Sequence, residues 1–104
     1  MKQLLLAVVL AVLAVFVSSA KVVDLYGVFN NFTCLVQQGY HHSIIRAYHS
    51  YGAIDTDAPS LIQQSNRAGL STDVYMFPCR GKNATVQVNE LINYLESITQ
   101  TKGL

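Results

Sequence analysis

The chain alternates short runs of β-branched and aromatic residues with segments whose apolar positions recur at helical spacing. The runs at 22–26, 43–48 and 73–77 predict strands. The segments at 32–38 and 58–68 predict helices, and the apolar residues between 88 and 98 predict a longer amphipathic helix. The order of predicted elements is therefore β-α-β-α-β-α.

Glycine, proline and aspartate mark several boundaries between these elements. Gly39 and Gly69 follow the first two predicted helices, where a residue in the left-handed conformation commonly ends a helix. Asp57 precedes the second helix as a natural N-cap, and Pro59 is tolerated in its first turn. Pro78 stops the third strand because proline cannot donate to the strand ladder. The Gly- and Asp-rich segment before Asp57 is predicted to be a loop.

The helices between the strands determine how the strands run. A helical crossover returns the chain to the same end of a sheet, so the three strands are predicted to lie parallel in an α/β fold. Three such units form either a small open sheet or the first part of an eight-unit barrel, which needs about 250 residues to close. The periodicity leaves both architectures open.

The first residues form a segment of a different kind. Lys2 gives a charged start, residues 4–17 carry no charge, and the small residues Ser18 and Ala20 follow where a signal peptidase reads. The apolar run is shorter than the roughly 20 residues that span a bilayer. Residues 1–20 are therefore predicted to be a cleaved signal peptide and residues 21–104 a single secreted domain, without membrane contact after cleavage.

The charge balance excludes several classes of partner. The sequence has 7 Lys and Arg residues and 6 Asp and Glu residues, a formal net charge of +1. Such a chain has no field that attracts nucleic acid or an anionic membrane, and neither partner is expected. No acid or thiol completes a ligand set with His41, His42 and His49, so no metal and no cofactor is expected.

Two cysteines and two sequons suit an extracellular chain. Cys34 and Cys79 are candidates for a disulfide in an oxidising compartment, although each could also be a buried thiol or have a partner outside this sequence. Asn31 and Asn83 each begin an Asn-x-Thr motif, so both are candidate glycosylation sites. These features concern the compartment and indicate no chemistry.

Four segments in order and register carry a resemblance to a known family. They are Phe32-x-Cys34-Leu35-x-x-x-Gly39-Tyr40, Ile45-Arg46-Ala47-Tyr48-His49-Ser50-x-Gly52-x-x-Asp55, Ala68-Gly69-Leu70 and Asp73-Val74-Tyr75-Met76-Phe77-Pro78-Cys79. Over residues 22–98 the chain resembles the invertebrate and amoebal branch of the glycoside hydrolase family 25 lysozymes. The resemblance implies a modified (β/α) TIM-like barrel, here incomplete, and secretion. It also implies cleavage of bacterial peptidoglycan in digestion or antibacterial innate immunity.

The resemblance also implies where the active site lies. In the family an Asp ends the first strand, and Val22-Val23-Asp24 matches that segment, which makes Asp24 the candidate catalytic residue. A rival register places Tyr26-Gly27-Val28 on the same motif and Phe29 where the acid belongs, but it requires a larger deletion. Other residues near the strand ends are candidates for substrate binding: Tyr48, His49, Asp55 and Tyr75.

Each of these residues has an alternative, purely structural interpretation. Asp55 and Asp57 could form an improvised catalytic pair, but they are more simply explained as residues that shape the turn and cap the following helix. His49 follows the second strand, where barrel enzymes gather functional groups, and could equally be a solvated loop residue. Tyrosines at strand positions pack in a core more often than they contact sugars.

The family's decisive pair is an Asp-x-Glu at the end of the fourth strand, where one carboxylate is kept protonated. The sequence contains no Asp-x-Glu and ends about where that strand would begin, so we expect it to be catalytically incomplete. Three hypotheses remain: the N-terminal portion of a lysozyme-type hydrolase, a secreted glycan-binding module without turnover, and a truncated product whose exposed strand edge prevents a stable fold.

Overall fold

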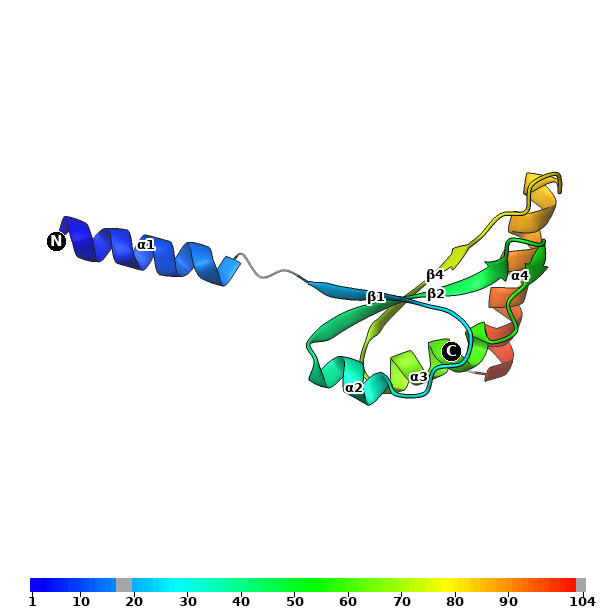
Figure 1. Cartoon of the computed structure of the whole chain (residues 1–104), viewed down its shortest axis with the longest axis horizontal. Helices are drawn as coiled ribbons and strands as arrows, with labels where there is room; N and C mark the ends of the chain where they lie inside the picture. Colours follow the sequence, from blue (N-terminus) through cyan, green and yellow to red (C-terminus); the bar gives the residue numbers. More distant parts are fainter. Residues whose placement is uncertain (17–19, 103–104) are drawn as a thin grey trace.

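The computed structural model describes residues 1–16 and 20–102 (Figure 1). Its elements are α1 (Lys2–Phe16), β1 (Lys21–Leu25), α2 (Phe32–Gln37), β2 (Tyr40–His49), β3 (Ala53–Ile54), α3 (Ala58–Arg67), β4 (Ser71–Met76) and α4 (Ala84–Lys102). The three predicted strands and the three predicted helices are confirmed, with ends displaced by a few residues. The predicted loop before Asp57 contains the additional strand β3.

The sheet is built around β2. β1 pairs with one side of β2 and β4 with the other, both in parallel, as the sequence predicted. β3 turns back and pairs antiparallel with the end of β2, which makes the sheet mixed. The pairing of the described residues is that of an open sheet and not of a closed barrel.

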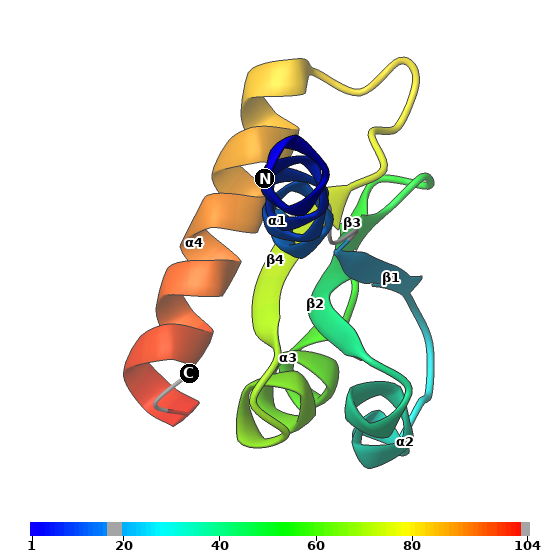
Figure 2. The same ribbon diagram turned by 90° about the vertical axis from the view of Figure 1, so that its left-hand side faces the viewer.

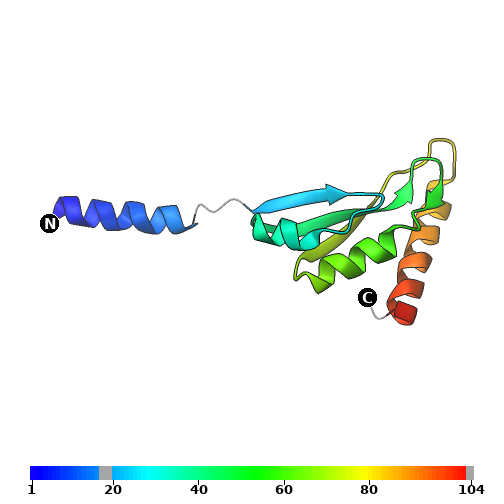
Figure 3. The same ribbon diagram turned by 60° about the horizontal axis from the view of Figure 1, so that its bottom comes forward.

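Helices α2 and α3 lie against one face of the sheet, and no helix of the described residues crosses the opposite face (Figures 1 and 3). α4 runs beside the β4 side of the sheet (Figure 2). Alternate side chains of β2, at Ser43, Ile45 and Ala47, are buried on the helix-covered face. They join a core that also contains the following residues: Phe32, Tyr48, Ala58, Leu61, Ile62, Leu70, Leu91 and Ile98.

Three hydroxyl groups connect α3 to the sheet. The Ser65 Oγ lies 2.7 Å from the Ser43 Oγ and 2.7 Å from the Thr72 Oγ1. Ser43 and Ser65 are fully buried, and the hydrogen bonds offset the cost of removing their hydroxyls from water. These small polar side chains let α3 pack closely on both β2 and β4.

The predicted helix boundaries are largely confirmed, but one cap differs. Gly39 and Gly69 have φ values of 88° and 90°, as expected for residues that end helices. Asp57 occupies the N-cap position of α3, but its side chain makes no capping hydrogen bond. The capping role predicted for the Asp57 side chain is therefore wrong. The backbone N–H of Asp57 instead donates to the Asp55 Oδ1 at 3.0 Å, because Asp55 turns inward.

Both sequon asparagines are helix N-caps. The Asn31 Oδ1 accepts a hydrogen bond from a backbone N–H of α2 at 3.2 Å, and the Asn83 Oδ1 accepts one from α4 at 3.1 Å. N-glycosylation uses the amide nitrogen and the cap uses the oxygen, so the two roles are compatible at each exposed asparagine. Glycosylation of Asn31 and Asn83 stays a prediction.

The predicted disulfide is not formed in the structure. Cys34 is an exposed free thiol in α2, and Cys79 is a partly buried free thiol after β4. α2 precedes the start of β2, whereas the segment after β4 lies at the far end of the sheet (Figure 1). A disulfide requires Cα atoms about 4.4 to 6.8 Å apart, so this pairing would need a rearranged backbone.

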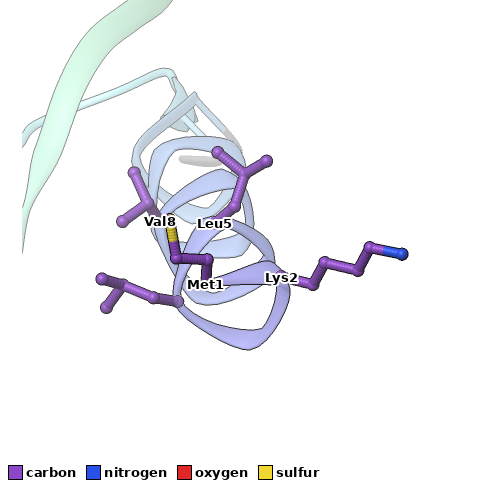
Figure 4. A pocket seen from close by; sticks show the side chains of 5 residues that line it. Met1, Lys2, Leu5 and Val8 are labelled. Atoms are coloured by element: carbon purple, nitrogen blue, oxygen red, sulfur yellow. The ribbon is translucent and has the colours of Figure 1, made fainter.

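The helix α1 lies apart from the sheet (Figure 1). A hollow at its start, shown in Figure 4, is formed by residues of this helix and its N-terminus alone: Met1, Lys2, Leu4, Leu5 and Val8. Among the described residues, no helix combines the length and the apolar character needed to cross a membrane. Residues 17–19, next to the predicted cleavage site, lie outside the described residues, and the signal peptide stays a prediction.

Candidate functional site

Polar and aromatic side chains gather on the uncovered face of the sheet. Side chains alternate between the two faces of a strand, so the Arg46 side chain points to the face opposite that of its buried neighbours Ile45 and Ala47. The parallel register places Tyr75 of β4 beside Arg46. We use the name open-face cluster for four residues from β1, β2 and β4 or directly after them: Asp24, Tyr26, Arg46 and Tyr75.

Arg46 is held by a buried carboxylate. Its Nε donates a hydrogen bond of 2.9 Å to the Asp55 Oδ2, and this hydrogen bond raises the pKa of Arg46. Asp55 is only 1% exposed, whereas the Arg46 side chain is 22% exposed. The second oxygen of Asp55 accepts the Asp57 N–H and lies 3.6 Å from the His49 Nε2. Asp55 therefore orients Arg46 from behind the open face and is itself shielded from a ligand.

Tyr26 holds Arg46 from the other side. The guanidinium carbon lies 4.6 Å from the centroid of the Tyr26 ring, an arrangement in which the cation is attracted to the ring face. Tyr26 is 64% exposed, so much of the ring remains accessible to a ligand. The two contacts fix the plane of the guanidinium group at the edge of the open-face cluster.

Asp24 and Tyr75 meet across the central strand. Asp24 is exposed on β1 and interacts with the Tyr75 hydroxyl of β4. Burial is the main cause that raises the pKa of Tyr75, and the contact with Asp24 raises it further. The hydroxyl thus stays protonated near neutral pH and remains a donor. The structure brings together the predicted catalytic carboxylate and one predicted substrate-binding tyrosine, whose roles stay predictions.

Tyr48 and His49, the other predicted substrate-binding residues on β2, lie elsewhere. A register irregularity between Arg46 and Tyr48 turns Tyr48 toward the covered side, where it is fully buried. His49 stacks on Tyr51 with ring centroids 4.5 Å apart and faces Asp55. Tyr48 is thus a core residue of this structure, and His49 contacts the carboxylate that supports Arg46.

The Tyr48 hydroxyl belongs to a second polar group, which joins α4 to the sheet. It donates to the Glu90 Oε2 at 2.6 Å and accepts from the Lys82 Nζ at 3.1 Å. The Lys82 Nζ also donates to Glu90 at 2.8 Å and to the Gly52 carbonyl oxygen at 2.8 Å. A Cβ at Gly52 would lie 3.3 Å from that of Cys79, so this close approach favours glycine. The group connects α4, the segment before it and the β2–β3 turn.

The pair of Lys82 and Glu90 predicts an acid-dependent loss of stability. The hydrogen bond from Lys82 lowers the pKa of Glu90 below its ordinary value of 4.5. A lowered carboxyl pKa contributes stability above the unfolded value, and this contribution is lost as the pH falls through the folded value. The urea midpoint of Glu90→Gln should therefore decline less than that of the wild type below about pH 4.5.

The control for this experiment is Glu96→Gln, which changes an exposed acid on the same helix. Its urea midpoint should follow the wild-type pH dependence. If the urea midpoint declined equally at acid pH in the wild type and in Glu90→Gln, the role of the Lys82–Glu90 pair would be contradicted.

Sequence reasoning missed three contributors to the open face. It did not select Tyr26 or Arg46 as a binding residue, and it did not predict the pair of His42 and Asp73. The His42 Nε2 and the Asp73 Oδ2 lie 3.0 Å apart. A signal was present, because central parallel strands are usually apolar on both faces, whereas β2 places His42 and Arg46 at alternate positions. The described residues contain no cluster of three or more side chains suited to holding a metal ion.

An α/β sheet whose main strands are parallel, with polar side chains near their carboxyl ends, is typical of enzymes of the α/β class. The family model described as "Lysozyme-like protein 1" matches residues 17–102. The chain therefore belongs to this lysozyme-like family, and the resemblance to the family 25 lysozymes is confirmed.

Curated relatives carry the same assignment. "Probable GH family 25 lysozyme 2" of Dictyostelium discoideum is 37% identical over 102 residues, which cover 96% of this chain and 45% of that protein. "Probable GH family 25 lysozyme 5" of the same organism is 41% identical over 69 residues, covering 64% of this chain and 32% of that protein.

A nematode protein is also similar. "Lysozyme-like protein 5" of Caenorhabditis elegans is 31% identical over 70 residues, which cover 66% of this chain and 33% of that protein. The chain thus spans less than half the length of each of these relatives. No solved structure matches the chain.

Proposed function

We propose that the protein is a secreted lysozyme-type protein that acts on bacterial peptidoglycan, and that the open-face cluster is the part of the glycan site which this chain supplies. The observation that carries the proposal is the position of Asp24, an exposed carboxylate at an uncovered face beside the Tyr75 hydroxyl. Family membership supports the substrate class. The exposed ring of Tyr26 offers a flat apolar surface of the kind on which sugar rings pack.

The strand order supports a finer proposal for the fold. β1, β2 and β4 are parallel neighbours in the order of the sequence, as the first strands of a (β/α) barrel would be. In such a barrel the uncovered face is the inner one, and functional groups at the strand ends point toward the substrate. The open-face cluster would then be one side of a sugar cleft.

The carboxylates of the chain support binding more than turnover. Glycoside hydrolysis needs an acid to protonate the leaving oxygen and a second group to attack or to activate water. Asp24 supplies one exposed carboxylate, whereas Asp55 is buried against Arg46 and accepts the N–H of Asp57. Asp73 shares the open face but is paired with His42. We therefore infer that this chain, which has no Asp-x-Glu, binds the glycan and does not cleave it.

The test is to express the full chain in a secretory host and to measure both its retention on insoluble peptidoglycan and its release of reducing ends. We expect retention without release. Asp24→Asn should weaken retention about fivefold, because it removes the charged acceptor for sugar hydroxyls. The matched control is Glu96→Gln, an acid-to-amide change on an exposed face of α4, which should bind as the wild type does.

Each contrary result rejects a different part of the proposal. Release of reducing ends by the wild type but not by Asp24→Asn would overturn the inferred lack of turnover. A folded, secreted chain that peptidoglycan does not retain would reject the substrate class. A chain that the host does not secrete in folded form would favour the truncated-product hypothesis.

A further inference from the structure

The central strand carries an arginine whose side chain is fixed before any ligand arrives. Arg46 lies between the buried carboxylate of Asp55, at 2.9 Å from its Nε, and the ring of Tyr26, at 4.6 Å from its guanidinium carbon. Asp55 is in turn held by the N–H of Asp57. A guanidinium group held in this way has little conformational freedom left to lose when it binds a ligand.

The contacts of Arg46 leave its outer nitrogens available. Arginine has five N–H donors, and the hydrogen bond to Asp55 uses the one on Nε. Among the side chains that the structure describes, this is the one hydrogen bond made by the guanidinium group. Two parallel N–H groups on the terminal nitrogens match the two oxygens of a carboxylate.

We propose that Arg46 binds a carboxylate of the glycan and so selects carboxylated amino-sugar polymers over neutral ones. The inference rests on the proposed function and names the chemical group of the substrate that this chain recognises. Peptidoglycan carries carboxylates on its peptide stems, and on the lactyl ether of each muramic sugar whose peptide has been removed. Chitin is a β-1,4-linked amino-sugar polymer that has neither.

The neighbours of Arg46 determine how the selection works. Tyr75, the cross-strand partner of Arg46, contacts Asp24, so a carboxylate bound at Arg46 places the sugar beside the Asp24–Tyr75 pair. Asp55 offsets much of the positive charge of Arg46. Selection therefore depends on the paired hydrogen bonds more than on net charge, and lysine, which lacks the planar fork, replaces Arg46 poorly. Asp55 and Tyr26 are positioning residues for this contact.

The experiment measures the affinity of the full chain for three insoluble probes. They are intact peptidoglycan, peptidoglycan stripped of its peptides by an amidase, and chitin. We expect the wild type to bind stripped peptidoglycan at least about tenfold more tightly than chitin. Arg46→Lys and Arg46→Gln should bind stripped peptidoglycan only as tightly as chitin. Arg67→Gln, at an exposed position of α3, is the matched control and should bind as the wild type.

The outcomes separate this inference from the proposed function. A preference for intact peptidoglycan that stripping removes would support the inference and assign the carboxylate to the peptide stem. Equal binding of peptidoglycan and chitin by the wild type would overturn the inference and leave the proposed glycan site in place. Binding to none of the probes would overturn both.

The variants are interpreted together with their stability. Arg46→Gln leaves the buried Asp55 without its charged partner, so Arg46→Lys, which keeps a cation there, decides the case. Thermal unfolding of each variant shows which of them is folded during the assay. A folded Arg46→Lys that keeps the full wild-type preference for stripped peptidoglycan would overturn the inference. The comparison of stripped peptidoglycan with chitin uses the wild type alone, so this test does not depend on the stability of any variant.

Discussion

Asp55→Ala is expected to lower the free energy of unfolding by about 3 to 5 kcal/mol. The carboxylate is 1% exposed, and its removal leaves the partly buried Arg46 guanidinium and the Asp57 N–H without their acceptors. A loss of this size is a large part of the roughly 5 to 15 kcal/mol that stabilises a small domain. Urea unfolding at neutral pH, followed by circular dichroism, measures it.

Asp57→Ala is the control, because it removes the same chemical group two residues away. The Asp57 side chain is exposed and makes no capping hydrogen bond, so the free energy of unfolding should change by less than about 1 kcal/mol. Similar losses for the two variants would show that the buried ion pair contributes no more than the loop as a whole.

Tyr48→Ala is expected to cost about 3 to 5 kcal/mol, as for other large aromatic side chains removed from a core. Tyr48 of β2 is fully buried in the core, and its hydroxyl contacts Glu90 of α4. Tyr48→Phe keeps the ring and removes the hydroxyl that joins Glu90 and Lys82, so it should cost about 1 kcal/mol. Chemical denaturation of both variants separates the ring from the hydroxyl.

The same pair of variants decides between a core role and a substrate contact for Tyr48. Tyr48→Phe should bind peptidoglycan as the wild type does, because its hydroxyl faces α4 and not the open face. Weaker peptidoglycan binding by a Tyr48→Phe variant of wild-type stability would restore Tyr48 to the substrate site.

The main elements of the fold could be predicted because their signals are local. Gly39 and Gly69 end their helices as predicted, and helical crossovers make strands parallel whatever the details of packing. β3 could not be predicted, since a two-residue strand is too short to show alternation. The position of Tyr48 was missed for a related reason. A register irregularity reverses the face of the sheet on which the following residues lie, and no residue type in the sequence predicts its position.

The site could be predicted only in part. Asp24 was predicted from the family resemblance and Tyr75 from its place on a strand. The structure brings the two together, and their roles stay predictions. Asp55 was expected beside the substrate, but the structure buries it. Whether an aspartate at a strand end faces solvent or an arginine depends on which side chain the neighbouring strand offers. Arg46 was overlooked because its importance comes from Asp55 and Tyr26, which are distant from it in sequence.

The contact between Asp24 and Tyr75 also sets an order of assembly. It joins the first and the last of the three parallel strands across the middle one, so it needs both outer strands in place. During synthesis the chain folds from its N-terminus, and β1 can pair with β2 before β4 has emerged from the ribosome. The sheet therefore begins without the complete open-face cluster. A ribosome-bound chain that ends before Tyr75 would have the arginine and its aspartate, but no tyrosine to meet Asp24.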